Sequence, residues 1–273
     1  MIDLVAIAGF FTNPYAMSHL ILLIPLLVSG SFASMASGIL NNIFDRDIDA
    51  KMNRVSKRRE VVRLNSKIMV GLLILFLLVS LTVGLSFLSP ISVFFVMCGF
   101  VSYAVLYTMI LKRRTDLNIV IGGIAGSFPA VAGSAAFMGI ISPASIFIAV
   151  LVFVWTPTHF WSLAIKYKQD YSDAGIPMLP SVKGIPATRR YILLNSIILA
   201  FVTVFPLIYQ KMGLNFIYLY VSVPLALWML IPSYYYFEKK GEAKEYRKLF
   251  SYTNGFLTLA LIFIIFSTFT IKI

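Results

Sequence analysis

The stretch "LILLIPLLVSGSFASMASGILNNIFDRDIDAKMNR", residues 20–54, joins an apolar run to a charged segment. Residues 20–40 carry no charged side chain, whereas Asp45, Asp47 and Asp49 follow shortly after them. A helix needs about 20 apolar residues to cross roughly 30 Å of hydrocarbon, so the run is long enough to span a membrane. The stretch therefore predicts a membrane helix that ends in an acidic loop.

Apolar runs of similar length recur along the whole chain of 273 residues, of which 59% are hydrophobic and only 12% charged. Soluble proteins do not repeat such runs, so the composition indicates an integral membrane protein. We expect an all-α bundle that forms a single domain over residues 1–273. Its eight full spans and one short N-terminal helix are predicted near residues 3–12, 17–43, 66–89, 91–111, 117–139, 143–167, 188–210, 214–237 and 247–272.

The net charge of +12 is explained by where the 23 Lys and Arg residues lie. Eight fall in 46–67, three in 112–114, five in 166–190 and five in 239–248, which are alternate loops of the predicted bundle. Positive charge gathers on the cytoplasmic loops of membrane proteins. We therefore expect a multi-pass protein of the cell membrane whose active site faces the cytoplasm, and we expect no nucleic-acid partner.

Asn41, Asp45 and Asp49 are spaced four residues apart, which places them along one face of a continuing helix. Acidic groups this close to the hydrocarbon edge repel one another unless a cation lies among them. Mg²⁺ binds one or two carboxylates and completes its shell with water and substrate phosphates. The spacing therefore indicates a metal site that takes a phosphorylated substrate.

A second polar loop, "KYKQDYSDAGIPMLP" at 166–180, echoes the acidic loop. Two four-helix halves that each end in such a loop would face each other across a shared cavity. In the alternative interpretation the first loop is merely solvated, and its aspartates pair with Arg46, Lys51 and Arg54. Stretches rich in small residues at 29–38 and 122–136 favour close helix packing, although they could also border a cavity.

The Asn-x-x-x-Asp-x-x-x-Asp motif after the second helix resembles the first aspartate-rich motif of the UbiA family of intramembrane prenyltransferases. Two further stretches, "LKRRTDLNIVIGGIAGSFPAVAG" at 111–133 and "WTPTHFWSLAIKYKQDYSDAGIPMLPSVKG" at 155–184, resemble the branch of that family that farnesylates haem. The resemblance implies a nine-helix bundle with a central cavity open to the cytoplasmic side. It also implies a truncated first helix, because nothing before Leu4 matches the Thr-Lys-Pro-Arg-like segment of the family.

The resemblance also assigns roles to residues of both polar loops. The residues that would hold Mg²⁺ are Asn41, Asp45, Asp49 and Asp170. The catalytic groups that would act on a prenyl diphosphate are Asp45, Asp49, Asp170, Lys112 and Arg113. The residues that would bind substrate are Asn41, Arg54, Thr115, His159, Lys166, Tyr167, Tyr171 and Asp173.

Some of these residues have structural alternatives. His159 would contact haem through the iron or a propionate, or else bond to a backbone carbonyl beside Pro157. Tyr167 and Tyr171 would steady the diphosphate, or else belong to the aromatic belt at the membrane interface. The prenyl chain would be held by apolar and aromatic side chains, for which Phe160 and Trp161 are candidates.

The implied reaction transfers the farnesyl group of farnesyl diphosphate to a vinyl group of haem B and gives haem O. Its implied partners are the membrane lipid, haem A synthase and a terminal oxidase under assembly. Two other functions stay open: prenyl transfer to an aromatic quinone precursor or a lipid, and cation transport by acids that line an ion path. Because the acids cluster at one membrane face instead of at mid-helix, the pattern argues against transport.

Overall fold

The computed structural model describes residues 1–52, 65–239 and 245–269, and every regular element among them is helical. The α-helices are α1 (Ile2–Phe11), α2 (Leu23–Phe44), α3 (Arg46–Asp49), α5 (Ser66–Phe87), α6 (Pro90–Val101), α7 (Asn118–Gly122), α8 (Phe128–Ser134), α9 (Pro143–Lys166), α10 (Lys168–Asp173), α11 (Leu179–Val182), α12 (Gly184–Val204), α13 (Phe216–Glu238) and α14 (Tyr246–Phe269). Shorter 3₁₀ or π segments are η1 (Ala16–Leu22), η3 (Ser102–Leu111), η4 (Gly123–Gly126), η5 (Phe205–Leu207) and η6 (Gln210–Met212). The expected all-helical fold is confirmed.

Seven helices in the described ranges are long and apolar enough to cross a membrane: Ala16–Phe44, Ser66–Phe87, Pro90–Leu111, Pro143–Lys166, Gly184–Leu207, Phe216–Glu238 and Tyr246–Thr268. Two of them begin in the same way. Ser89 and Ser142 each accept a hydrogen bond from a backbone amide of the first turn, and a proline follows each serine. Serine caps and a first-turn proline favour helix initiation, which explains why α6 and α9 begin at these positions.

The prediction of an eighth full span at 117–139 is wrong. The apolar helix there extends only over Asn118–Ser134 and is divided into α7, η4 and α8. Glycine has a low helix propensity, and glycines occur at both ends of η4, while Pro129 in the first turn of α8 starts a new helix. The described residues therefore form seven long spans and two shorter apolar helices, of which α1 is the other.

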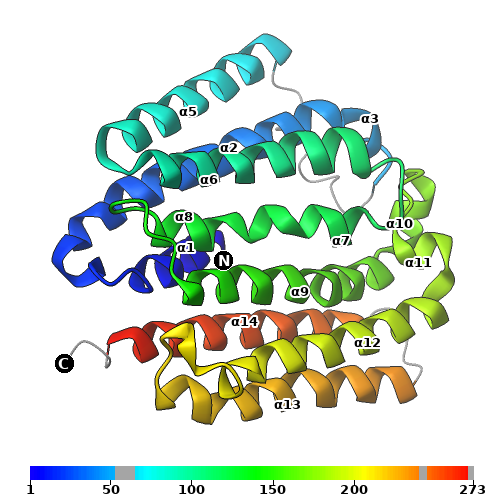
Figure 1. Cartoon of the computed structure of the whole chain (residues 1–273). Helices are drawn as coiled ribbons and strands as arrows, with labels where there is room; N and C mark the ends of the chain where they lie inside the picture. The colour runs from blue at the N-terminus through cyan, green and yellow to red at the C-terminus, as the bar shows by residue number, and fades with distance from the viewer. Residues whose placement is uncertain (53–64, 240–244, 270–273) are drawn as a thin grey trace.

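The helices form three groups in space (Figure 1). One group contains α2, α5 and α6, another contains α12, α13 and α14, and between them lie α1, α8 and α9. Of the seven spans, α9 has the largest share of buried residues, and it packs against α8, α12 and α14. Its residues Ile148, Leu151 and Trp155 join the main hydrophobic core, so α9 is the axis on which the other groups pack.

The short polar elements gather at one end of the bundle. Figure 1 shows α3, α10 and α11 at that end, and the connections after α5 and α8 at the opposite end. An ion pair of 3.2 Å between Lys183 Nζ and Asp116 Oδ2 links the start of α12 to the loop after η3, and Asp116 raises the pKa of Lys183. The acidic loop, which contains α3, and the second polar loop, which contains α10, share this end of the bundle (Figure 1), while its orientation toward the cytoplasm stays a prediction.

The short helix α1 is buried and packs directly against α8. Gly9 of α1 faces the backbone of Ala130, and Gly133 of α8 faces the backbone of Ala6. A methyl group on either glycine would overlap a carbonyl oxygen of the other helix. Small residues let membrane helices approach closely, so these two glycines set the distance between α1 and α8.

We predict that Gly9→Ala and Gly133→Ala each lower the midpoint of thermal unfolding in detergent. The added methyl group pushes α1 away from α8, and overpacking of this kind costs about 1–3 kcal/mol. Size-exclusion chromatography of samples heated to a series of temperatures measures the fraction of protein that stays folded.

Gly71→Ala is the matched control, because nothing lies within 4 Å of a methyl group at this position in α5. Alanine has a higher helix propensity than glycine, so this variant should unfold at or above the wild-type temperature. Equal midpoints for all three variants would contradict the close contact between α1 and α8.

Candidate functional site

A cavity of about 630 Å³ lies within the bundle, a volume typical of ligand pockets. Its wall contains residues of α1, α2, α3, α6, α7, α8, α9, α10 and α14, together with η3 and η4. Among the described residues, none from α5, α12 or α13 reaches it. Both halves of the chain therefore border the cavity, as expected, but unequally, because the N-terminal half and α9 supply most of the wall.

Small residues keep this space open. From the two small-residue stretches, the wall takes Gly30, Ala33, Ser34, Ser37, Gly38, Gly122, Gly123, Ala125, Gly126, Pro129 and Ala132. Sequence analysis favoured helix packing for both stretches. The structure assigns packing to Gly133 and cavity lining to the residues just named, because a side chain without bulk leaves room on its helix face.

The polar end of the cavity is formed by Asn41, Asn42, Asp49 and Lys112. Helical spacing continues through this segment, because the Asp45 amide donates to Asn41 O at 2.9 Å and the Asp49 amide donates to Asp45 O at 2.7 Å. The backbone angles of Asp45 depart from helical values, which separates α2 from α3. The expected alignment of the three motif residues is thus largely retained across this break.

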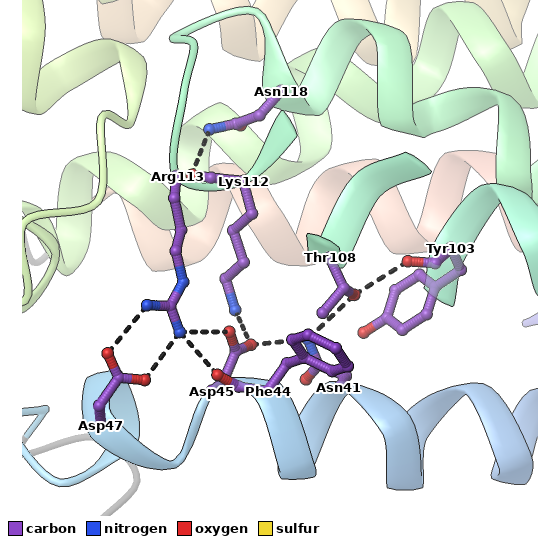
Figure 2. Close-up of polar contacts among 9 residues, drawn as sticks. All are labelled: Asn41, Phe44, Asp45, Asp47, Tyr103, Thr108, Lys112, Arg113 and Asn118. Atoms are coloured by element: carbon purple, nitrogen blue, oxygen red, sulfur yellow. Dashed lines mark hydrogen bonds and ion pairs between the residues drawn. The ribbon is translucent and has the colours of Figure 1, made fainter. Parts of the chain in front are cut away.

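Asp45 lies behind the polar end and is almost completely buried, with 1% of its surface exposed. Its Oδ2 accepts hydrogen bonds from Asn41 Nδ2 at 2.7 Å and from Lys112 Nζ (Figure 2). Its Oδ1 accepts no hydrogen bond, and Arg113 Nη2 lies 3.8 Å away. A buried carboxylate without a partner is strongly destabilising, so the burial of Asp45 depends on Lys112.

Arg113 forms a bidentate ion pair with the exposed Asp47 (Figure 2). Its Nη1 and Nη2 donate to the two carboxylate oxygens at 2.8 and 2.7 Å. These bonds hold the pKa of Asp47 below its usual range. The alternative of an acidic loop paired only with its own cations is wrong for Asp45 and Asp47, because their partners come from the loop after η3.

The π-helix η3 places Lys112 next to Asp45. The sequence pattern did not indicate that this segment is a π-helix. The Lys112 amide donates to Tyr107 O at 2.8 Å, five residues back along the chain. One turn earlier, Thr108 Oγ1 accepts a hydrogen bond from Asn41 Nδ2 at 3.2 Å. Turns of π-helix are rare and frequently occur at functional sites. This one brings Thr108 and Lys112 against the end of α2.

The donors at the polar end fit a divalent cation when a phosphate completes the shell. Asp45 Oδ1 is buried without a hydrogen bond, and the oxygens of Asn41 and Asp49 lie on the same segment. In the described ranges, no three Asp, Glu, His or Cys side chains are grouped closely enough to hold a metal by themselves. Mg²⁺ normally keeps water or substrate phosphate oxygens in its shell, so a substrate that carries phosphate suits this donor set.

The second polar loop contributes Tyr171, Ile176 and Met178 to the cavity wall. Asp170, the neighbour of Tyr171, is half-buried. Predicted site residues that line the cavity are Asn41, Asp49, Lys112, His159 and Tyr171. Those outside its wall are Asp45, Arg113, Thr115, Lys166, Tyr167, Asp170 and Asp173, and Arg54 lies outside the described residues.

Several residues outside the wall have local partners. Lys166 Nζ lies over the ring of Tyr167, 4.6 Å from its centroid. Asp173 Oδ1 accepts a hydrogen bond from Gln169 Nε2 at 2.7 Å. Thr115 Oγ1 accepts one from a backbone amide two residues on, at 3.2 Å. These side chains would have to exchange such contacts for a ligand in order to bind it.

His159 of α9 lines the cavity, and only 6% of its surface is exposed. Its ring is stacked between those of Trp155 and Phe250, with centroid distances of 4.1 and 4.2 Å. Its Nδ1 lies 2.7 Å from Thr253 Oγ1. The alternative in which this histidine bonds to a backbone carbonyl is wrong, because its partner is a hydroxyl group of α14.

Sequence reasoning missed the contribution of α14. Phe250 and Thr253 contact His159, while Asn254 and Leu257 line the cavity. The sequence did contain a signal, because Thr253 and Asn254 are adjacent polar residues inside an apolar span, and such residues mark functional or packing contacts. The stretches on which the family resemblance rested end at residue 184, so they drew no attention to α14.

Aromatic side chains form much of the remaining wall, namely Phe95, Phe100, Tyr103, Tyr107, Trp155 and Phe160. Phe160 lines the cavity, and its contact with a prenyl chain stays a prediction. The expectation for Trp161 is wrong, since this residue is buried near Tyr191 and does not reach the cavity. Trp161 instead belongs to a hydrophobic cluster with Ala164, Ile165 and Ile192.

Known proteins resemble the chain over most of its length. A profile of the UbiA prenyltransferase family matches residues 4–268. The chain is 41% identical over 272 residues to protoheme IX farnesyltransferase 2 of Picrophilus torridus, a match that covers 96% of this chain and 91% of that protein. It is 40% identical over 232 residues to protoheme IX farnesyltransferase of Alcanivorax borkumensis, covering 81% and 77%.

Two solved structures share the fold at low sequence identity. A structure of digeranylgeranylglyceryl phosphate synthase has a TM-score of 0.80 at 13% identity, over 98% of this chain and 93% of that one. A UbiA homolog from Archaeoglobus fulgidus, bound to DMAPP and Mg²⁺, has a TM-score of 0.66 at 15% identity, over 96% and 94%. With seven apolar spans among its described residues and a family match over nearly its whole length, the chain is a multi-pass membrane protein and belongs to the UbiA prenyltransferase family.

Proposed function

We propose that this chain transfers the farnesyl group of farnesyl diphosphate to a vinyl group of haem B, giving haem O, in a Mg²⁺-dependent reaction. The observation that carries the proposal is one cavity that combines a charged end at Asp49 and Lys112, a largely apolar interior and His159 in its wall. Two relatives at 41% and 40% identity support the proposal, because both are named protoheme IX farnesyltransferases.

The diphosphate would lie at the charged end of the cavity. Mg²⁺ would be held there by Asn41, Asp45, Asp49 and Asp170 together with diphosphate oxygens, and the Archaeoglobus homolog bound to DMAPP and Mg²⁺ supports this assignment. The metal supplies charge neutralisation to the leaving group. Asp170 would join from the second polar loop, whose Tyr171 already lines the cavity.

Lys112 has two tasks in this proposal. It neutralises the buried Asp45, and because it also lines the cavity it can reach the diphosphate oxygens as negative charge develops on them. A positive charge fixed in a water-poor site stabilises such a leaving group more than the same charge does in water. Arg113 and Lys166, which lie outside the wall, would attract the diphosphate through their positive charge. Thr115, Tyr167 and Asp173 also lie outside the wall and stay proposed substrate-binding residues, as does Arg54, which lies outside the described residues.

The farnesyl chain would occupy the apolar part of the cavity. Small residues such as Gly30, Ala33 and Gly126 leave room for it, and the aromatic rings of Phe160 and Tyr107 offer π-faces to an allylic cation. Exclusion of bulk water by this wall protects the cation from premature hydrolysis.

The haem would lie where His159 meets the cavity. The bond between farnesyl C1 and the diphosphate oxygen breaks, and C1 bonds to the terminal carbon of the vinyl group. This leaves a positive charge on the carbon next to the macrocycle. A water molecule adds to that carbon and loses a proton, which gives the hydroxyethylfarnesyl side chain without any change of redox state.

We further propose that the polar end of the bundle faces the cytoplasm, because the basic loops gather there and positive charge favours that side. Counted with the two shorter apolar helices, the seven described spans would make up the nine helices of a single domain over residues 1–273. The product would pass in the cell membrane to haem A synthase or to a terminal oxidase under assembly.

We predict that purified protein in detergent, supplied with haem B, farnesyl diphosphate and Mg²⁺, forms hydroxyfarnesylated haem that mass spectrometry detects. Asp45→Ala should form none, because it removes a carboxylate that would hold the metal. Transfer only to an aromatic quinone precursor or a lipid alcohol would contradict haem as the acceptor. Cation binding without transfer to any acceptor would instead favour a transporter.

We predict that Asp49→Asn lowers the rate of product formation about a hundredfold or more, because it removes a carboxylate that would hold the Mg²⁺ that neutralises the leaving group. Chelation of Mg²⁺ should abolish the wild-type activity. Initial rates at saturating substrate concentrations measure both effects.

Asp47→Asn is the matched control on the same short helix, because Asp47 is exposed and pairs with Arg113 outside the cavity wall. It should keep activity within a few-fold of wild type, since exposed ion pairs contribute only about 0–1 kcal/mol. Equal losses in the two variants would contradict the assignment of Asp49 to the site.

We predict that Lys112→Met destabilises the protein as well as inactivating it. Removal of one partner from a buried ion pair leaves an uncompensated charge and costs about 3–5 kcal/mol. Thermal unfolding in detergent with a chelator present measures this loss. The double variant Asp45→Asn, Lys112→Met should recover stability but not activity, whereas an unchanged midpoint for Lys112→Met would contradict the dependence of Asp45 on Lys112.

A further inference from the structure

The imidazole of His159 is fixed on three sides by residues that the proposed reaction does not use. Trp155 and Phe250 stack on its two faces at 4.1 and 4.2 Å, with interplanar angles of 23° and 26°. Thr253 holds the ring edge, with Oγ1 at 2.7 Å from Nδ1. The Thr253 carbonyl also accepts a hydrogen bond from Trp155 Nε1 at 2.8 Å. One residue of α14 thus anchors both His159 and Trp155 of α9.

The hydroxyl proton of Thr253 has a determined direction. Thr253 Oγ1 lies 2.7 Å from the carbonyl oxygen of Phe250, which can only accept a hydrogen bond. Two oxygens this close without a proton between them would repel each other, so the hydroxyl donates to Phe250 O. Because a hydroxyl has only one proton, Oγ1 can take part in a second hydrogen bond only as the acceptor. The group at 2.7 Å on its other side, His159 Nδ1, must therefore be the donor.

We infer that Thr253 is a positioning residue that holds His159 as the Nδ1–H tautomer and leaves the lone pair of Nε2 for a ligand in the cavity. The hydrogen bond made by one ring nitrogen sets the state of the other. Nε2 forms no hydrogen bond with any residue of the described ranges, while the side chain lines the cavity. The arrangement matches that of metal-binding histidines, whose second nitrogen donates to a protein oxygen.

The part of this inference that concerns haem rests on the proposed function, whereas the tautomer does not. With haem B as the acceptor substrate, the free Nε2 lone pair would form a coordinate bond to the iron. No electron or proton is transferred in that step. Stacking on Trp155 and Phe250 prevents the ring from turning, so the iron, and with it the macrocycle, would be held at one place along α9.

Nuclear magnetic resonance of protein labelled with ¹⁵N-histidine tests the tautomer directly, because the chain contains two histidines only. The signals are assigned with His19→Gln. We expect wild type and Thr253→Ser, which keeps the hydroxyl, to show a protonated Nδ1 and an unprotonated Nε2. Thr253→Val removes the acceptor, so its ring should shift toward the Nε2–H tautomer. An Nε2–H or doubly protonated ring in wild type, or an unchanged tautomer in Thr253→Val, would overturn the inference.

Titration with haem B in the absence of farnesyl diphosphate tests the consequence for binding. Loss of a hydrogen-bond partner behind a metal-binding histidine costs about 10–100-fold in affinity, and we expect this loss, with an altered Soret band, for Thr253→Val. Thr253→Ser should bind as wild type does. Thr258→Val is the matched control. It also removes a hydroxyl group from α14, but this hydroxyl contacts Met1 and not His159.

The two proposals fail in different ways. If wild type forms hydroxyfarnesylated haem but Thr253→Val binds haem with unchanged affinity and spectrum, the positioning role is overturned while the proposed function stands. If wild type neither binds haem nor forms this product, yet shows the expected tautomer and its loss in Thr253→Val, the proposed function fails and the tautomer inference stands. Thermal unfolding of each variant shows that a loss of binding is not a loss of folding.

Discussion

The buried carboxylate of Asp45 at the edge of the membrane is the constraint on which the polar end of the bundle depends. With 1% of its surface exposed, it requires a cation, and Lys112 supplies one from a different span. The π-helix η3 makes this reach feasible, because its wider turns bring Thr108 and Lys112 against the end of α2. The same lysine lines the cavity, so one ion pair links the stability of the bundle to the charge of its site.

The rest of the cavity follows from how closely its helices approach. Gly9 and Gly133 let α1 and α8 meet backbone to backbone, while glycine and alanine residues of α2, α7 and η4 leave space on the inner faces. Short polar helices then cluster at one end (Figure 1), so the cavity is charged where it meets them and mostly apolar elsewhere. That separation suits a substrate with an anionic head and a hydrocarbon tail, which the reaction proposed for this UbiA family member requires.

Most helices and part of the site could be predicted from the amino-acid sequence, and the failures have physical causes. Apolar runs mark membrane spans because hydrocarbon thickness sets their length, so the long spans lie within a few residues of their predicted positions. The interruption at η4 was missed because glycine and proline weaken a helix without abolishing its apolar character. Among the predicted site residues, five line one cavity, namely Asn41, Asp49, Lys112, His159 and Tyr171, and their roles stay predictions.

The sequence by itself determined that the chain is an all-helical membrane protein, which loops carry its charge, and which family its motifs resemble. These properties depend on composition, local spacing and the thickness of hydrocarbon. Tertiary structure alone decided that Lys112 neutralises Asp45, that η3 is a π-helix, that Trp161 faces away from the cavity, and that Thr253 supports His159. Each of these is a contact or an orientation set by packing between helices, and contacts between residues far apart in the chain leave no periodic pattern in the sequence.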